Sequence, residues 1–290
     1  MDRARGPGPE VPVDVRIAVA SQSFGAGFPG LMYGQLRHHA HPEHRLVECA
    51  IVLRDDPDFV RSRLLRLLDG DAKPTALIGV CIRPDRETVE AFRAAGAPVV
   101  LIDEEQEGAS TVASDNFAGG YVAGQHLAHS GRRMPAVVAG QMHTNGGYNA
   151  LQRVKGFAKA LAERHVSFRV EDVVEVVDYS RKEGLSALGT ILRVRPEVDA
   201  VFCAAGDVCA TGLLATARDL RVKVPDRLAV VGYDDNPLAS ISNPPLTTVR
   251  QPVDQIAAEA LRLATRLAAD VVREPKRILF EPKLVQRVSA

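Results

Sequence analysis

Two neighbouring carboxylates, Asp234 and Asp235, directly follow the apolar run VVGY at residues 230–233. Two acids at the end of a buried strand could form a catalytic pair, bind a metal ion, cap a helix or line a pocket for a polar ligand. Neighbouring residues on an extended strand point to opposite faces, so these two side chains cannot easily aim at one scissile bond. This counts against a paired-carboxylate hydrolase and leaves a binding role or a turn role open.

The other residues that could bind a metal or act as nucleophiles are the cysteines and histidines. Cys203 and Cys209 are the closest pair of the four cysteines, but they lack a Cys-x-x-Cys spacing, so we expect free thiols in the core. The histidines of residues 37–44 straddle a predicted helix end and a proline, which favours a solvated turn. The sequence shows no phosphate-cradling glycine-rich motif and no G-x-S-x-G elbow. We therefore expect no catalytic residue, no metal site and no cofactor.

Composition and charge limit the possible partners. The 290 residues are enough for two domains, and 46% of them are hydrophobic. Lys plus Arg and Asp plus Glu both number 36, so no net charge draws the protein to nucleic acid or to an anionic membrane. No apolar run is long enough to span a bilayer, and residues 1–15 lack the apolar core of a secretory signal. We expect a cytoplasmic protein with a disordered leader at 1–15.

Short apolar runs alternate with amphipathic segments along the chain. The runs are rich in β-branched residues and predict strands buried on both faces, and several helical segments between them end in glycine. Strict alternation predicts an α/β fold with parallel sheets and right-handed crossovers. The predicted strands cover residues 16–20, 46–53, 75–80, 98–102, 135–139, 173–177, 200–204 and 228–232, and the main helices cover 57–70, 86–96, 116–131, 147–164 and 207–220.

Eight such strands could close into one barrel or divide between two open sheets. The polar segment 103–116 and the proline-rich segment after Tyr233 both break the rhythm, which favours a chain that crosses between two sheets. We therefore predict two doubly wound parallel-sheet lobes around a cleft, and the barrel remains the structural alternative. In open parallel sheets, ligands bind beyond the carboxyl ends of the strands.

The chain resembles the effector-binding core of the LacI/GalR family of bacterial transcriptional regulators, which has a periplasmic-binding-protein-like type I fold. The resemblance covers residue 16 to the end and implies a sensor of a small polar metabolite, with a sugar or sugar derivative expected first, rather than an enzyme. The matching motifs, in family order, are APVVLID (97–103), the stretch from VASDN to VVAG (112–140), QRVKGFAKAL (152–161), the stretch from AVFCAAGD to VVGYDD (200–235), PPLTTVRQP (244–252) and LVQRVSA (284–290).

The same resemblance implies how the lobes divide. The first lobe would take residues 16–114 and 252–275, and the second would take 115–250 and 278–290, so that three crossings connect them. A hinge of this kind lets two lobes close on a ligand, with the population shifting toward the state that the ligand contacts better.

Three polar residues correspond to ligand contacts of the family, and a fourth, Gln251, is a candidate contact by its position. Asp234 would accept hydrogen bonds from ligand hydroxyls or amines, its alternative being a cap or turn residue, and Asp235 is then the turn residue. Arg153 would reach into the pocket with its fork of donors, its alternative being a solvated arginine. Asp103 is the corresponding acid of the first lobe, or else only the start of an acidic loop. Gln251 stands at the last crossing, where its amide can both donate and accept.

Aromatic and glycine positions refine the expected pocket. Phe24 and Phe28 lie in the predicted loop 21–30 and could stack on the apolar face of a sugar or base, or else pack in the core. Gly206 stands where the family commonly has an asparagine that contacts ligand, which makes a standard hexose or pentose pattern less certain. Asp207 is predicted to cap the helix that follows.

The family's regulators also carry an N-terminal helix-turn-helix, and the residues before Arg16 are too few to form one. We therefore expect DNA binding only through a module absent from this chain, and we expect the core to pair as a homodimer. The main alternative is a solute-binding protein of an uptake system, and an α/β hydrolytic enzyme is less favoured.

Overall fold

The chain forms two compact units, described in a computed structural model over residues 15–25, 27–51, 56–143, 147–269 and 274–290. The first unit contains the described residues up to Gly25, then Met32–Val112 and Asp254–Ile278. The second contains residues 27–31, Ala113–Val253 and Leu279–Ala290. The predicted leader at 1–15 lies outside the described residues apart from residue 15.

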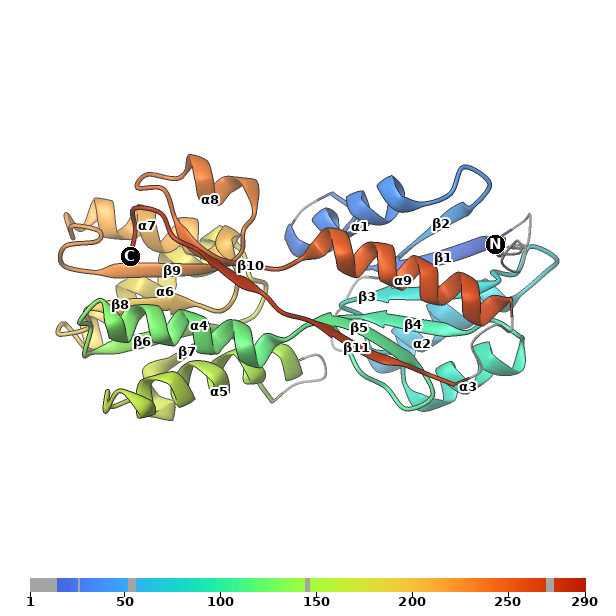
Figure 1. Ribbon diagram of the computed structural model, residues 1–290, viewed down its shortest axis with the longest axis horizontal. Coiled ribbons are helices and arrows are strands. Elements are labelled where there is room, and N and C mark those ends of the chain that lie inside the picture. The colour runs from blue at the N-terminus through green and yellow to red at the C-terminus, as the bar shows by residue number, and fades with distance from the viewer. Residues whose placement is uncertain (1–14, 26, 52–55, 144–146, 270–273) are drawn as a thin grey trace, which may run out of the picture. The chain divides into compact units, whose positions relative to one another are not determined.

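The first unit is built on a six-stranded sheet with the strand order β11-β5-β4-β3-β1-β2 (Figure 1). Strands β1 to β5 pair in parallel in this order. The strands are β1 (Arg16–Ser21), β2 (Arg45–Ala50), β3 (Ala76–Val80), β4 (Val99–Ile102), β5 (Ser110–Ser114) and β11 (Arg277–Phe280). The accompanying helices are α1 (Gly27–His39), α2 (Pro57–Leu65) with the 3-10 turn η1 (Arg66–Leu68), α3 (Arg86–Ala94) and α9 (Val253–Ala268).

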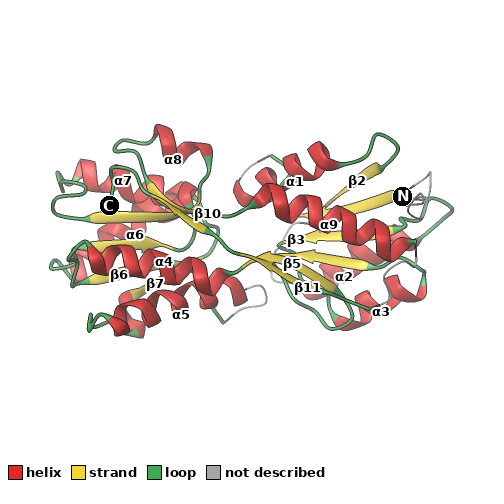
Figure 2. Ribbon diagram, viewed as in Figure 1, coloured by secondary structure: helices red, strands yellow, loops and turns green. Residues whose placement is uncertain are grey.

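The second unit repeats this plan, with a sheet flanked by helices (Figure 2). Its strand order is β12-β10-β9-β8-β6-β7, in which only the terminal pair β10–β12 is antiparallel. Two open, mostly parallel sheets confirm the predicted α/β fold class and exclude the closed barrel. The strands are β6 (Pro135–Gly140), β7 (Val173–Val176), β8 (Ala200–Cys203), β9 (Ala229–Asp234), β10 (Thr247–Arg250) and β12 (Lys283–Val285). The helical elements are α4 (Asn116–His129), α5 (Tyr148–Glu163), η2 (Val170–Asp172), α6 (Arg181–Val194), α7 (Asp207–Asp219) and α8 (Pro237–Ile241).

Three sequence predictions about strands were wrong. The segment 103–116, predicted as a polar crossover, contains the fully buried strand β5, and the Thr111 hydroxyl there is satisfied by the Glu104 carbonyl at 3.1 Å. Strand β10 was missed for a similar reason, because its two threonines are polar but buried. Strand β2 is mostly exposed rather than buried on both faces, because it is the edge strand and pairs only with β1.

Acidic and hydroxyl residues set where several helices begin. Asp85 accepts a hydrogen bond from the Thr88 amide at 2.7 Å at the start of α3, and Asp115 accepts one from the Ala118 amide at 2.9 Å at the start of α4. Such side chains satisfy amide groups that have no partner inside the helix. The Asp115 cap fixes the first residue of α4 at the end of β5.

Glycines allow helices of the second unit to pack at backbone contact. A Cβ atom on Gly120 of α4 would overlap the carbonyl oxygen of Arg153, and one on Gly156 of α5 would overlap that of Phe117. The two glycines are therefore reciprocal, each facing the backbone of the other helix. This close approach fixes Arg153 relative to the start of α4.

Separate apolar clusters lie on the two faces of the second sheet. One includes Phe157, Phe202 and Tyr233, and the Phe157 and Phe202 rings stack with centroids 5.1 Å apart. The other includes Cys203 and Cys209, which are buried free thiols as the sequence predicts. Both faces of the sheet are thus covered by helices, as expected of parallel strands.

We predict that Gly120→Ala lowers the free energy of unfolding by roughly 1–3 kcal/mol, since the added methyl group must push α5 away from α4. The matched control is Gly189→Ala within α6, where an added Cβ meets nothing within 4 Å. That control should gain up to about 1 kcal/mol from higher helix propensity. Urea denaturation of both variants checks the prediction, and equal effects of the two substitutions would contradict it.

Candidate functional site

The guanidinium of Arg153 is buried and held on three sides. Its Nε donates to Asn116 Oδ1 at 2.6 Å and its Nη1 donates to the Ala204 carbonyl at 2.9 Å, while the Tyr233 ring centroid lies 3.8 Å from Cζ. The residue is only 7% exposed, so the alternative of a solvated arginine is excluded. A buried cation with fixed partners is a directed set of donors rather than a mobile surface charge.

Asn116 links the arginine to the end of β5, and sequence reasoning missed it. Its Oδ1 also accepts from the Tyr233 hydroxyl at 3.3 Å, and its Nδ2 donates to the Asn149 Oδ1 at 3.1 Å and to the Ser114 carbonyl at 3.3 Å. The signal available in the sequence was an asparagine directly after Asp115, at the start of the predicted helix 116–131.

Asp234 ends β9 with its carboxylate against Gly206. A Cβ at Gly206 would lie 2.7 Å from Asp234 Oδ2, and the Gly206 φ of 95° lies in the region that favours glycine. Asp234 Oδ1 accepts from Gln251 Nε2 at 2.7 Å. Because an ionised carboxylate can only accept hydrogen bonds, the Gln251 amide must turn its NH2 group toward Asp234. The glycine at this position therefore makes room for the acid.

Asp207 is a buried acid, and the prediction that it caps α7 was wrong. The N-cap residue is Gly206, and the Asp207 side chain turns inward, where its two oxygens accept from the Thr248 hydroxyl and the Asn236 amide, both at 2.7 Å. Burial, and then the negative charge of Asp234, raise the pKa of Asp207 well above its usual range. The acid joins the start of α7 to β10 and to the turn after β9.

Asp235 is more than a turn residue. Its carboxylate, 9% exposed, accepts from Arg250 Nε and from Arg287 Nη2, both at 2.6 Å. Asp234 and Asp235 also have positive φ values of 101° and 52°, so the chain is not extended here, and our premise of an extended strand was wrong. The side chains of the two acids nevertheless bind different partners. A backbone conformation of this sparsely populated kind costs of order 1–3 kcal/mol per residue.

Asp103 and Glu104 are two consecutive buried acids in the first unit. Asp103 follows β4 with a φ of 63° and is 4% exposed, so it is not merely the start of a solvated loop. Its amide donates to the Val112 carbonyl at 3.3 Å. Glu104 is also 4% exposed. Burial, and then the charge of Asp103, raise the pKa of Glu104 to about 8.

The two predicted phenylalanines are placed differently. Phe24 is partly exposed in the first unit, and its ring meets Tyr33 edge-on with centroids 4.7 Å apart. Phe28 is 8% exposed and lies in the first turn of α1, because the helix begins at Gly27 inside the predicted loop. Phe28 belongs to residues 27–31, which group with the second unit.

Tyr179 is a second residue that sequence reasoning missed. It is 39% exposed, has a φ of 55°, and precedes Ser180, which caps α6. A Cβ on Gly140, the last residue of β6, would overlap the Tyr179 hydroxyl. The Tyr179 side chain therefore lies at the carboxyl end of β6. Its position depends on a left-handed backbone conformation, which no sequence pattern indicates.

The second unit thus brings together Arg153, Asp234 and Gln251 from the predicted set. Arg153 packs on Tyr233, the residue before Asp234, and Gln251 follows β10 and binds Asp234. Asp234 and Gln251 lie at the carboxyl ends of the neighbouring strands β9 and β10, and the Arg153 guanidinium, which comes from α5, binds the Ala204 carbonyl just after β8. Asp103 and Phe24 belong to the first unit.

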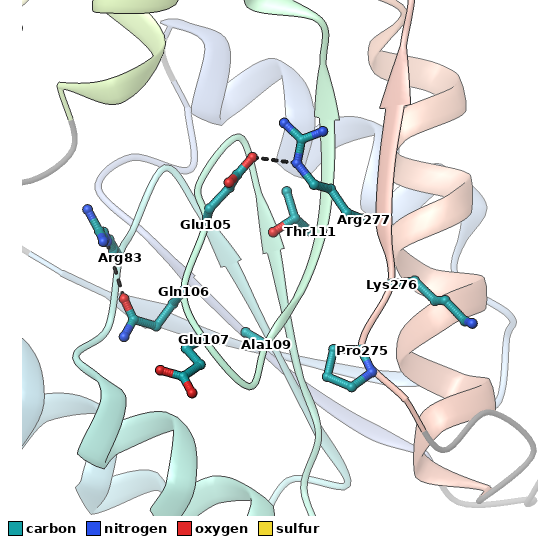
Figure 3. Close-up of a pocket in the computed structure, with 9 residues that line it drawn as sticks. All are labelled: Arg83, Glu105, Gln106, Glu107, Ala109, Thr111, Pro275, Lys276 and Arg277. Atoms are coloured by element: carbon teal, nitrogen blue, oxygen red, sulfur yellow. Dashed lines mark hydrogen bonds and ion pairs between the residues drawn. The ribbon is translucent and has the colours of Figure 1, made fainter.

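A separate polar depression of about 390 Å³ lies in the first unit (Figure 3). An ion pair between Arg277 Nε and Glu105 Oε1 at 2.8 Å and a hydrogen bond from Arg83 Nε to Gln106 Oε1 at 3.3 Å lie along its rim. None of the predicted ligand residues lines it. Its lining residues are Arg83, Glu105, Gln106, Glu107, Ala109, Thr111, Pro275, Lys276 and Arg277.

The described ranges carry neither a metal-binding cluster nor a membrane-spanning helix. Among these residues, no group of three or more His, Cys, Asp or Glu side chains is placed to bind a metal ion. The helices described are also too short or too polar to cross a bilayer.

Residues 125–290 match the periplasmic binding protein-like domain. The chain belongs to this family. It is 27% identical over 240 residues to the HTH-type transcriptional repressor PurR of Actinobacillus pleuropneumoniae serotype 5b (strain L20), covering 81% of this chain and 69% of that protein. It is 33% identical over 195 residues to PurR of Yersinia enterocolitica serotype O:8 / biotype 1B, covering 66% of this chain and 56% of that protein.

Solved structures agree on the fold. The transcriptional regulator CelR in complex with cellobiose superposes with a TM-score of 0.81 at 24% identity, covering 96% of this chain and 86% of that one. A periplasmic binding protein/LacI transcriptional regulator from Alkaliphilus metalliredigens QYMF, complexed with D-xylulofuranose, also gives 0.81, at 20% identity and 95% and 98% coverage. The resemblance to the LacI/GalR effector-binding core is confirmed. The relatives are transcriptional regulators, which supports the expectation of a sensor rather than an enzyme.

We predict that Glu104 makes the stability of the protein depend on pH. Its folded pKa of about 8 exceeds the ordinary 4.5, so its contribution is fully present below about pH 4.5 and is lost as the pH rises toward 8. Relative to Glu104→Gln, the parent should lose up to about 1.4 kcal/mol of unfolding free energy per pH unit in that window.

Urea denaturation of the parent and of Glu104→Gln at several pH values from 5 to about 9 measures this difference. Glu107→Gln, at an exposed carboxyl of the same loop, is the control. A parent-to-variant difference that stays constant with pH would contradict the assignment of Glu104.

Proposed function

We propose that this chain senses a small polar metabolite as the effector of a LacI-type transcriptional regulator, with Arg153, Asp234 and Gln251 as direct contacts. The observation that carries the proposal is the buried, three-sided hold on Arg153 beside the Tyr233–Asp234 end of β9. Ligands of open parallel sheets bind at the carboxyl ends of the strands, where these groups stand.

The chemistry of the three side chains suits a ligand with several hydroxyl or amine groups. Asp234 can accept from such groups, Arg153 can donate to ligand oxygens, and the partly exposed ring of Tyr179 offers an apolar face of the kind that sugars and bases stack on. Sugars are bound in three of the related structures: cellobiose in CelR, D-xylulofuranose in the Alkaliphilus regulator and ribose in a LacI family regulator from Enterococcus faecium. We therefore propose a sugar or sugar derivative.

Three more residues, Asp103, Phe24 and Phe28, are proposed as further effector contacts. We also propose that one lobe takes residues 16–114 and 252–275 and that the other takes 115–250 and 278–290. We also place the sensor in the cytoplasm, because transcriptional repressors such as its relatives act on DNA there.

We predict that Asp234→Asn weakens effector binding about ten- to a hundredfold, since a hydrogen bond to a charged group contributes roughly 1.5–3 kcal/mol. A thermal-shift screen of sugars, polyols and nucleosides, beginning with cellobiose and ribose, would find the effector. Calorimetry would then give the dissociation constants of the parent and the variant.

The control for that experiment is Asp219→Asn, an exposed acid at the end of α7, which should bind as the parent does. Unchanged affinity in Asp234→Asn would show that this carboxylate is no effector contact. If no compound shifts the melting temperature of the parent, the proposed function itself fails.

We further propose that the protein is a homodimer, because a two-fold pair is the commonest oligomer and α8 leaves apolar side chains on the surface. Leu238 and Ile241 of this short helix are 39% and 77% exposed. Sedimentation equilibrium should give twice the chain mass of 31.2 kDa at micromolar concentration. A single mass of 31.2 kDa across that range would contradict dimerisation.

A further inference from the structure

Asp235 binds two arginines that are distant in the sequence, Arg250 and Arg287, at the end of β9. Its Oδ2 accepts from Arg250 Nε in β10, and its Oδ1 accepts from Arg287 Nη2 in the final segment after β12, both at 2.6 Å. Arg287 is itself tied down, because its Nη1 donates to the Leu246 carbonyl at 2.8 Å and its amide donates to Thr247 Oγ1 at 2.9 Å. The carboxylate therefore has two partners that are anchored on β10.

The same turn holds a backbone conformation that needs such anchoring. Asp234 and Asp235 have consecutive φ values of 101° and 52°. The second lies in the left-handed region that aspartate visits more readily than most residues, whereas the first lies beyond it and is kept only when the surroundings enforce it. The amides at the turn are also bonded, Asp235 to Thr248 Oγ1 at 3.4 Å and Asn236 to Asp207 Oδ2 at 2.7 Å. The two arginine ion pairs are the strongest of these restraints, because both partners are charged.

The anchored turn controls where the Asp234 carboxylate points. Asp234 and Arg250 are paired in the register of β9 and β10, and the next residue, Gln251, donates to Asp234 at 2.7 Å. Asp235 thus holds Arg250 while Asp234 is held by Gln251, its neighbour in the chain. Loss of the Asp235 ion pairs would release both the turn and the residue beside Gln251.

We propose that Asp235 is a positioning residue for effector binding, which through Arg250 and Arg287 holds the turn that presents Asp234 and does not itself touch the effector. This rests on the proposed function only for the role of Asp234. The two neighbouring acids then have different roles: Asp234 contacts the ligand, and Asp235 holds the backbone conformation that orients the Asp234 carboxylate.

A crystal structure of Asp235→Asn tests the proposal without any ligand. Asn keeps the size of the side chain but loses its charge, so the turn should leave its positive φ values and the Gln251 Nε2 to residue 234 Oδ1 separation should exceed about 3.5 Å. Asp219→Asn, at an exposed acid 3.7 Å from Arg218, should change neither. An unchanged turn and an unchanged Gln251 contact in Asp235→Asn would overturn the proposal.

Arg250→Ala gives the same test if Asp235→Asn fails to fold, since Arg250 is 58% exposed and only one ion pair is removed. Its turn should shift in the same direction by a smaller amount. A turn identical to that of the parent in this variant would count against the anchoring role of Arg250.

Affinity measurements separate positioning from direct contact. Calorimetry with cellobiose and ribose as probes should show binding about tenfold weaker in Asp235→Asn, and the double variant with Asp234→Asn should be no weaker than Asp234→Asn alone. Losses that multiply independently would make Asp235 a separate contact and overturn the proposal. If neither sugar binds the parent, the proposed sugar effector fails, while the crystal structure still decides the role of Asp235.

Discussion

The burial of one guanidinium, that of Arg153, is the constraint on which the polar site of the second unit depends. A buried charge is costly unless its partners are in place, and here they come from three elements besides α5: Asn116 of α4, the carbonyl of Ala204 after β8, and the Tyr233 ring of β9. The reciprocal glycines Gly120 and Gly156 allow α4 and α5 to approach closely enough for these bonds to form. The arginine thus fixes the elements whose ends carry the other polar groups.

The two acids after Tyr233 are placed by the same packing, because Arg153 holds the Tyr233 ring directly before them. Asp234 turns its carboxylate against Gly206 and Gln251, and Asp235 turns to its two arginines. Asp207 lies buried close enough that the charge of Asp234 raises its pKa, so the region holds more carboxyl groups than it can easily ionise. Cationic or hydrogen-bond-donating groups at Asp234 fit such a surrounding well.

How much the sequence predicts depends on the distance between partners. The alternation of strands and helices, the two sheets and the positions of Arg153, Asp234 and Gln251 follow from local periodicity and from motifs in family order. Strands β5 and β10 were missed because Ser and Thr read as polar, although the hydroxyls of Thr111 and Thr248 find acceptors inside the fold. The roles of Asp207 and Asp235 were missed because their partners, Thr248 and Arg287, lie 41 and 52 residues further along the chain.

A crystal structure of the chain with the tightest-binding compound from a sugar and nucleoside screen would show whether Arg153 and Asp234 bind the effector. Ligand density is expected within about 3.2 Å of both the Asp234 carboxylate and the Arg153 guanidinium. Density that touches neither residue, for instance in the depression lined by Arg83 and Arg277 of the first unit, would contradict this expectation.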